Sequence, residues 1–303
     1  LMLHSRTPRW EELPASVLLT DDALLEAIDV VPVLRLLARP APAPGEMLDW
    51  LQAEGFVTRV ATGGGYVTNL GAIGAARTLT AFADLARKSV RVIRYRGTSK
   101  HTLQREHELT VGYAVGFDRL LELVTDQLPS VEVIVGARRE TRHTYPPLAL
   151  REIIANALIH QDFAIAGTGP RVEIFDDRVE VANPGALLPS KSLDRLIGTQ
   201  PESRNERLAR AFRRYRICEE QGSGLLKAGL EVELYGLPPL AFEAGPNHFK
   251  VTLFAPRTWA QMTPTERLQA CYQHAVIRHF SGRTLTNTSL RERLRMPDKQ
   301  RSM

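Results

Sequence analysis

The stretch Arg151-Glu-Ile-Ile-Ala-Asn-Ala-Leu-Ile-His-Gln-Asp-Phe163 decides how this chain folds. Glu152, Asn156 and His160 are spaced four residues apart, which places a carboxylate, an amide and an imidazole near one face of a helix. Such a row suits a site that activates water and holds a metal-phosphate, although an amphipathic helix with a solvated polar face is the alternative. The opposite face carries the apolar residues Ile153, Ile154, Ala157 and Leu158.

Two predicted strands follow this helix and form a hairpin. They cover Arg171–Phe175 and Arg178–Ala182, with Asp176 and Asp177 at the turn between them. Valine and isoleucine alternate with polar residues along both strands, as expected for strands with one buried face. The second strand ends in Asn183-Pro-Gly185.

A glycine-rich turn, Gln221-Gly-Ser-Gly-Leu-Leu-Lys227, precedes another predicted helix. Glycines let backbone N–H groups approach an anion, and a helix N-terminus favours negative charge. Taken alone, the same residues could form an ordinary tight turn. The order of a Glu-x3-Asn helix, a strand ending in Asn-Pro-Gly and a Gly-Ser-Gly helix start is the more specific signal.

Four phrases of the chain together resemble a known family. They are Leu150-Arg-Glu-Ile-Ile-Ala-Asn-Ala-Leu-Ile-His-Gln-Asp162, Asp177-Arg-Val-Glu-Val-Ala-Asn-Pro-Gly185, Ser203-Arg-Asn205 and Glu220-Gln-Gly-Ser-Gly-Leu225. The chain resembles the GHKL, or Bergerat-fold, ATP-binding domain shared by gyrase B, MutL and histidine kinases. More narrowly, it is similar to bacterial ATP-binding transcriptional regulators that are labelled as related to the RecG helicase. Those proteins usually carry a Schlafen AlbA-type DNA-binding domain at the N-terminus.

The resemblance implies roles for the helix residues. Glu152 would be the general base that orients the attacking water. Asn156 would offer its amide oxygen to Mg²⁺, which bridges the phosphates of ATP, and His160 would lie near those phosphates. A structural alternative for His160 is that it caps or pairs within its own helix.

The resemblance also implies roles outside the helix. Asn183 would accept a hydrogen bond from the adenine amino group, and Gly185 would allow the base to approach closely. Arg204 lies in the segment that forms a lid in the family and could bind phosphate bidentately. Gly222 and Gly224, with Ser223 between them, would cradle phosphate oxygens at a helix start.

The first glycine box departs from the family pattern. Asn183-Pro-Gly-Ala-Leu187 replaces the usual Asp-x-Gly-x-Gly, so the acceptor is uncharged and the second glycine is missing. ATP binding with Mg²⁺ is therefore expected, but any hydrolysis should be slow. The sequence contains no Gly-x4-Gly-Lys-Ser/Thr phosphate loop, so a helicase motor is not supported.

Composition is that of a soluble globular protein of two or three domains. The 303 residues are 44% hydrophobic and 24% charged, and no run of about eighteen apolar residues predicts a membrane span. Cys218 and Cys271 lie far apart without metal-ligand spacing, which favours a reducing cytoplasm.

Positive charge is concentrated in the segment 259–303. It holds eight basic and three acidic residues, and eight minus three is +5, the net charge of the whole chain. Thr263-Pro-Thr-Glu266 predicts a capped helix to about His279; a second helix should start at Asn287 or Thr288 and a third at Lys299. This order predicts a partial helix-turn-helix of winged-helix type, with a basic helical appendage as the alternative. The candidate DNA-binding residues are Arg291, Arg293, Arg295, Lys299 and Arg301.

The remaining elements predict a two-layer α/β sandwich with small helical ends. We expect an N-terminal segment 1–80, a GHKL-like ATP-binding domain 81–258 and the helix-turn-helix segment 259–303. In the first segment, a helix and a glycine-tipped hairpin resemble a wing, although a remnant of an AlbA-type domain is the preferred interpretation. The expected helices are 21–37, 46–54, 70–88 and 114–127, and the expected further strands are 90–95, 102–110 and 131–138.

These features together predict a cytoplasmic, homodimeric, ATP-binding transcriptional regulator whose nucleotide state alters DNA binding or dimerisation. An ATPase enzyme of DNA repair or phage defence is one alternative. A nucleotide-free interaction module that keeps the fold is another.

Overall fold

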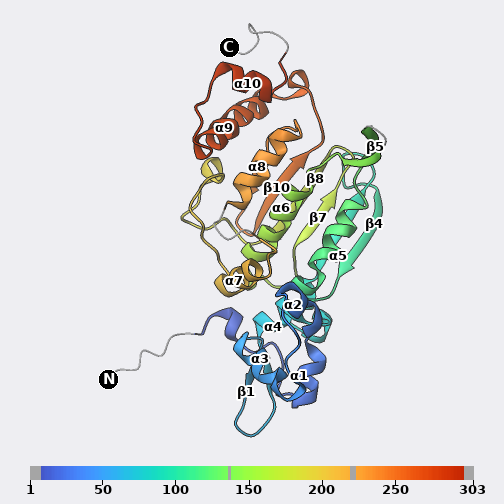
Figure 1. Cartoon of the computed structure of the whole chain (residues 1–303), viewed down its shortest axis with the longest axis vertical. Coiled ribbons are helices and arrows are strands. Elements are labelled where there is room, and N and C mark those ends of the chain that lie inside the picture. The colour runs from blue at the N-terminus through green and yellow to red at the C-terminus, as the bar shows by residue number, and fades with distance from the viewer. Residues whose placement is uncertain (1–7, 136–137, 219–222, 297–303) are drawn as a thin grey trace, which may run out of the picture.

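The computed structural model describes residues 8–135, 138–218 and 223–296. Its elements follow one another along the long axis of an elongated molecule (Figure 1). A small N-terminal unit lies at one end, a central α/β body follows, and two C-terminal helices lie at the other end. No helix in these ranges is long and apolar enough to cross a membrane.

The central body contains a six-stranded sheet in the order β4-β3-β7-β8-β10-β9. Only β3 and β7 run parallel, and the other neighbours are antiparallel. The strands are β3 (Val90–Tyr95), β4 (Leu103–Leu109), β7 (Arg171–Ile174), β8 (Arg178–Pro184), β9 (Ala241–Ala244) and β10 (His248–Phe254). The predicted hairpin is confirmed, with Val172 paired to Val181 across it.

Three helices cover one face of this sheet: α5 (Tyr113–Thr125), α6 (Pro147–His160) and α8 (Gly224–Leu234). Helix α6 is central, because it contacts β8 and both neighbouring helices. Its apolar residues Ile153, Ile154 and Leu158 are buried, as their helical spacing predicts. The two-layer α/β sandwich expected from the sequence is therefore confirmed.

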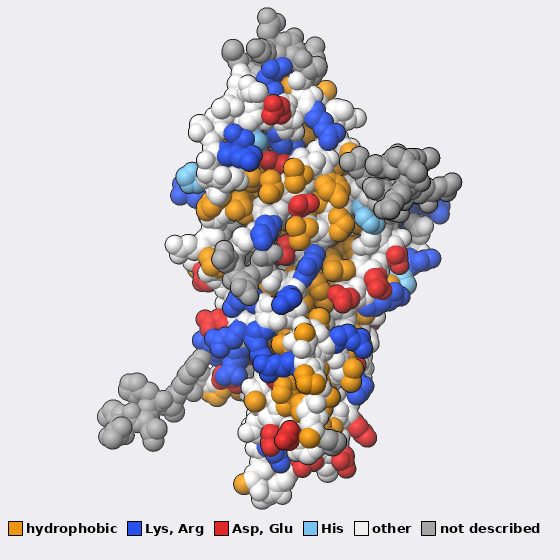
Figure 2. All heavy atoms as spheres, in the orientation of Figure 1, with side chains coloured by type: hydrophobic (Ala, Val, Ile, Leu, Met, Phe, Trp, Pro, Cys, Tyr) orange, Lys and Arg blue, Asp and Glu red, His pale blue; other side chains and the backbone are white. Residues whose placement is uncertain are grey.

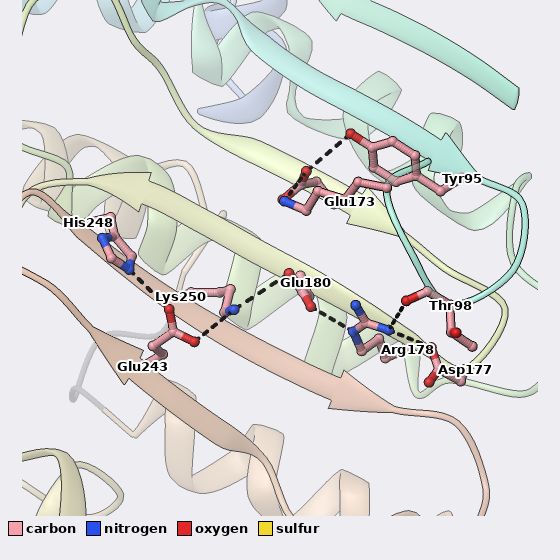
Figure 3. A network of polar contacts seen from close by, with 10 residues as sticks. Tyr95, Thr98, Glu173, Asp177, Arg178, Glu180, Glu243, His248 and Lys250 are labelled. Atoms are coloured by element: carbon pink, nitrogen blue, oxygen red, sulfur yellow. Dashed lines mark hydrogen bonds and ion pairs between the residues drawn. The ribbon is translucent and has the colours of Figure 1, made fainter. Parts of the chain in front are cut away.

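The other face of the sheet carries ion-paired charges (Figure 3). Glu173 of β7 binds Lys100 at 2.7 Å, and Glu180 of β8 binds Arg178 at 2.6 Å. Because each buried carboxylate has a cation beside it, this face needs no second layer of helices.

The N-terminal unit contains η1 (Trp10–Glu12), α1 (Asp21–Ala27), α2 (Val30–Leu36), η2 (Pro44–Glu46), α3 (Met47–Ala53), the hairpin β1 (Val57–Arg59) and β2 (Gly65–Val67), and α4 (Asn69–Ala75). Two predictions were wrong here. The helix expected over 21–37 is broken, because Ile28 is extended and pairs with Ala76. The helix expected over 70–88 ends at Ala75 for the same reason, and only the 3-10 turns η3 (Leu79–Ala81) and η4 (Ala86–Lys88) follow.

The single strand predicted over 131–138 is a separate hairpin of β5 (Ser130–Val135) and β6 (Arg138–His143). Farther along the chain are η5 (Leu193–Arg195), α7 (Glu206–Arg214), η6 (Trp259–Gln261), α9 (Pro264–Phe280) and α10 (Asn287–Arg293). The capping box at the start of α9 is confirmed, since Thr263 and Glu266 exchange hydrogen bonds of 2.8 and 3.2 Å. The third helix expected at 299–303 lies outside the described residues.

Candidate nucleotide-binding site

The polar stripe of α6 lines a cavity of about 650 Å³. Glu152, Asn156 and His160 all contribute to its wall, as their i, i+4, i+8 spacing predicts. Glu152 is only 2% exposed, and its side chain faces the start of α8. Asn156 is half-buried and makes no side-chain hydrogen bond to another described residue. A cavity of this size suits a small-molecule ligand.

The end of β8 forms a second wall of the cavity. Asn183 is buried there, and its Nδ2 atom donates to the Pro184 carbonyl at 3.1 Å. That bond leaves the amide oxygen of Asn183 as an acceptor for a ligand. Gly185 has a φ of +108°, and a Cβ atom there would lie 2.7 Å from that of Asp162. The close approach that Gly185 permits is therefore to the end of α6, which differs from the base contact expected for it.

The start of α8 forms a third wall of the cavity. Gly224 lines the cavity, and a Cβ atom at this position would overlap the Oε2 atom of Glu152. A side chain at position 224 would therefore displace the Glu152 carboxylate. Ser223 precedes the helix as its N-cap residue without a side-chain capping bond. Gly222 lies outside the described residues.

The segment 189–205, which the sequence predicts as a lid, contributes Lys191, Gln200 and Ser203 to the cavity wall. Lys191 Nζ donates to the Gln200 carbonyl and lies 3.7 Å from Glu202. Arg204 of this segment differs from its expected position. It donates to the Ala186 carbonyl at 2.9 Å and lies 3.4 Å from Asp162, beside the cavity but not in its wall.

Asn205 holds the end of α6 in place. Its Nδ2 atom donates to the Ile159 carbonyl at 2.7 Å and to the Gln161 carbonyl at 2.8 Å. Both carbonyls lack a partner within the helix, so this buried amide completes the C-terminus of α6. Within the Ser-Arg-Asn phrase, Asn205 is therefore the residue that fixes the helix end next to His160.

Two cations in the cavity wall were missed by the sequence analysis. They are Lys191 of the lid and Arg213 of α7, and Arg213 has no acidic partner among the described residues. Amphipathic spacing of arginines along α7 was the available signal for Arg213. Nothing in the sequence distinguishes Lys191 from the other lysines.

The imidazole of His160 is shielded from solvent and lies near two cations. Burial lowers the pKa of His160 to about 4, and the nearby charges of Arg204 and Lys191 act in the same direction. Its imidazole is therefore neutral at pH 7 and can bind a ligand by hydrogen bonding but not by charge.

The predicted DNA-binding arginines do not form one exposed surface. Arg293 is buried, lies 3.3 Å from Glu233 of α8 and donates to the Leu237 carbonyl at 2.7 Å. Its prediction as a DNA contact was wrong, because it joins α10 to α8 in the interior. Arg291 is half-buried and Arg295 is exposed, whereas Lys299 and Arg301 lie outside the described residues.

Comparisons with known proteins agree with this geometry. A family model described as "Putative ATP-dependent DNA helicase recG C-terminal" matches residues 167–253, the region that contains the β7–β8 hairpin and the start of α8. Residues 167–253 are therefore similar to an ATPase-like domain of the RecG-related group. No curated protein matches the chain.

One solved structure is similar over nearly the whole chain. It is the DIP2311 protein from Corynebacterium diphtheriae, with a TM-score of 0.62 and 18% sequence identity, covering 98% of this chain and 59% of that chain. The present chain thus spans about three fifths of that protein's length. At this identity the likeness concerns the fold.

Proposed function

We propose that this chain is an ATP-binding regulator that binds Mg·ATP in the cavity between α6, β8, the lid and α8. The observation that supports the proposal is that Glu152, Asn156, His160, Asn183 and Gly224, which come from three separate segments, all line that one cavity. The match of the central region to an ATPase-like family points in the same direction.

The adenine base would lie at the β8 end of the cavity. There the amide oxygen of Asn183 would accept a hydrogen bond from the 6-amino group. The phosphates would lie between α6 and the start of α8. Lys191 and Arg213 would balance their charge, and the backbone at Ser223 and Gly224 would approach them closely. Neutral His160 would offer one further hydrogen bond.

Mg²⁺ would bind in this site together with the phosphates of the nucleotide. Mg²⁺ is usually held by one or two protein oxygens together with substrate phosphates, and it neutralises their charge. Asn156, whose amide is unpaired among the described residues, would supply the protein oxygen. The described residues contain no group of three acidic, histidine or cysteine side chains that could hold a metal alone.

Nucleotide occupancy would act on the C-terminal helices through α8. This helix begins beside Glu152, and its Glu233 binds His274 of α9 at 2.9 Å. The lid also lies against the end of α9, because a Cβ atom at Gly198 would overlap the ring of Phe280. We propose that this coupling changes DNA binding or dimerisation by the C-terminal unit. We further propose that the chain divides into segments 1–80, 81–258 and 259–303.

The first test is the melting temperature with and without millimolar Mg·ATP. A ligand at a hundred times its Kd adds roughly 2.7 kcal/mol to the free energy of unfolding, so a shift of roughly 5 °C is expected. Asn156→Ala should remove the shift, while the matched control Asn287→Ala, at an exposed position on α10, should keep it. If the wild-type protein melts at the same temperature with and without Mg·ATP, the fold acts without nucleotide.

A second candidate is that the same site hydrolyses ATP slowly. The buried carboxylate of Glu152 lines the cavity one helical turn before Asn156, a position that suits a general base for water. Glu152→Gln should then retain the melting shift and lose steady phosphate release. Equal turnover in both proteins would remove Glu152 from that role.

A further inference from the structure

Helix α7 has three distinct faces. Glu206, Ala209 and Arg213 line the nucleotide cavity, and Leu208 and Phe212 are buried in the core. The third face points outward and carries Arg207, Arg210 and Arg214. From 206 to 216 the chain has five arginines and one glutamate, and five minus one leaves a local charge of +4.

Some of these arginines have structural partners. Arg207 binds Glu12 at 2.5 Å, and Arg214 binds Glu54 through two hydrogen bonds of 2.6 and 2.9 Å. Both acids belong to the N-terminal unit, so these pairs attach that unit to α7.

Three other arginines have no such partner. Arg210, Arg213 and Arg216 form no ion pair with any described residue. Arg210 lies on the outward face of α7, Arg213 lines the cavity, and Arg216 follows the end of the helix with a φ of +57°. Arg151 of α6 joins them, because its guanidinium donates to the Arg216 carbonyl. Cations without an acidic partner repel one another unless an anion lies near them.

We call Arg151, Arg210 and Arg216, which lie outside the cavity wall, the α7 arginine surface. Figure 2 shows blue side chains gathered in this region, between the N-terminal unit and the central body. Guanidinium groups match the planar, bidentate geometry of phosphate, and several of them on one segment suit an anion of repeating charge. The C-terminal helices offer fewer arginines for contact with phosphate, since Arg293 is buried.

We propose that the α7 arginine surface binds the phosphate backbone of duplex DNA. Single-stranded nucleic acid is held chiefly by bases stacked on exposed aromatic rings. The aromatic residues of this region, Phe212 and Tyr215, are both buried, so they offer no such platform. Backbone contacts of this kind are independent of base sequence and sensitive to salt. The DNA contact is therefore assigned to the region between the N-terminal unit and the central body, and not to α10 alone.

The test measures binding of the full chain to a labelled 30-base-pair duplex of arbitrary sequence by fluorescence anisotropy across a salt series. The variant is Arg210→Glu/Arg216→Glu, which leaves the cavity wall intact. The charge-matched control is Arg35→Glu/Arg119→Glu, at exposed positions on α2 and α5. We expect the variant to bind at least tenfold more weakly at low salt. The slope of log K against log salt should fall by roughly 0.9 for each phosphate that the variant no longer neutralises, about two phosphates in all.

Several results would overturn the inference. They are no duplex binding by the wild-type chain, an equal loss in the charge-matched control, or tighter binding to single-stranded RNA or to anionic vesicles. A loss caused by Arg291→Glu/Arg295→Glu alone, with the α7 variant unaffected, would place the DNA on the C-terminal helices instead. The Mg·ATP melting shift is measured separately on each variant. Failure of DNA binding is thereby distinguished from failure of the nucleotide site, and the melting curves also report that the variants fold.

Discussion

Replacing Arg293 by alanine tests whether this arginine stabilises the packing of α10 on α8 or contacts DNA. Its side chain is 4% exposed and lies 3.3 Å from Glu233, and it donates to the Leu237 carbonyl at 2.7 Å. Burial is the largest influence on Arg293 and lowers its pKa from the ordinary value. Removing one member of a buried ion pair costs roughly 3–5 kcal/mol, because the partner charge stays buried without compensation.

The expected loss for Arg293→Ala is at the lower end of that range. Glu233 keeps a second partner, His274 Nδ1 at 2.9 Å, which partly compensates its charge. We therefore predict a fall of about 3 kcal/mol in the free energy of unfolding of the C-terminal unit. The salt dependence of DNA binding by the folded protein should not change.

Urea denaturation followed by tryptophan fluorescence measures this effect, since Trp259 packs against the C-terminal helices. Arg283→Ala, at an exposed position between α9 and α10, is the matched control and should change stability by less than about 0.5 kcal/mol. The double variant Glu233→Gln/Arg293→Met should be less destabilised than the sum of its single changes. A loss below about 1 kcal/mol in Arg293→Ala, together with a flatter salt slope, would refute the reasoning.

Two further predictions concern α6. Asn205→Ala leaves the Ile159 and Gln161 carbonyls without their donor, so the free energy of unfolding should fall by about 2–3 kcal/mol. The urea midpoint measures this loss, with Gln200→Ala as the control. His160 has a folded pKa of about 4, below its unfolded value near 6.5, so its neutral form stabilises the fold above pH 6.5 and this contribution is lost as pH falls towards 4. His160→Gln should therefore lose less stability than wild type between pH 6.5 and pH 4. If the urea midpoints of the two proteins fall by the same amount over that range, the lowered pKa of His160 is contradicted.

Local sequence patterns predicted the central body well. The hairpin of β7 and β8, the helix α6 and the capping box of α9 depend on side-chain periodicity and on bonds between residues three or four apart. The same patterns failed at Ile28 and Ala76. There, pairing between residues far apart in the chain ended two predicted helices.

The sequence by itself determined the polar stripe of Glu152, Asn156 and His160, because a helix places residues four apart on one face whatever surrounds it. It also determined where positive charge accumulates along the chain. Only the tertiary structure decided which charges are available. Packing of α10 on α8 took Arg293 into the interior, and folding of the lid and α7 over α6 brought Lys191 and Arg213 into the cavity wall. Charge is a property of the residue, but its partner and its solvation depend on segments that meet only in the folded chain.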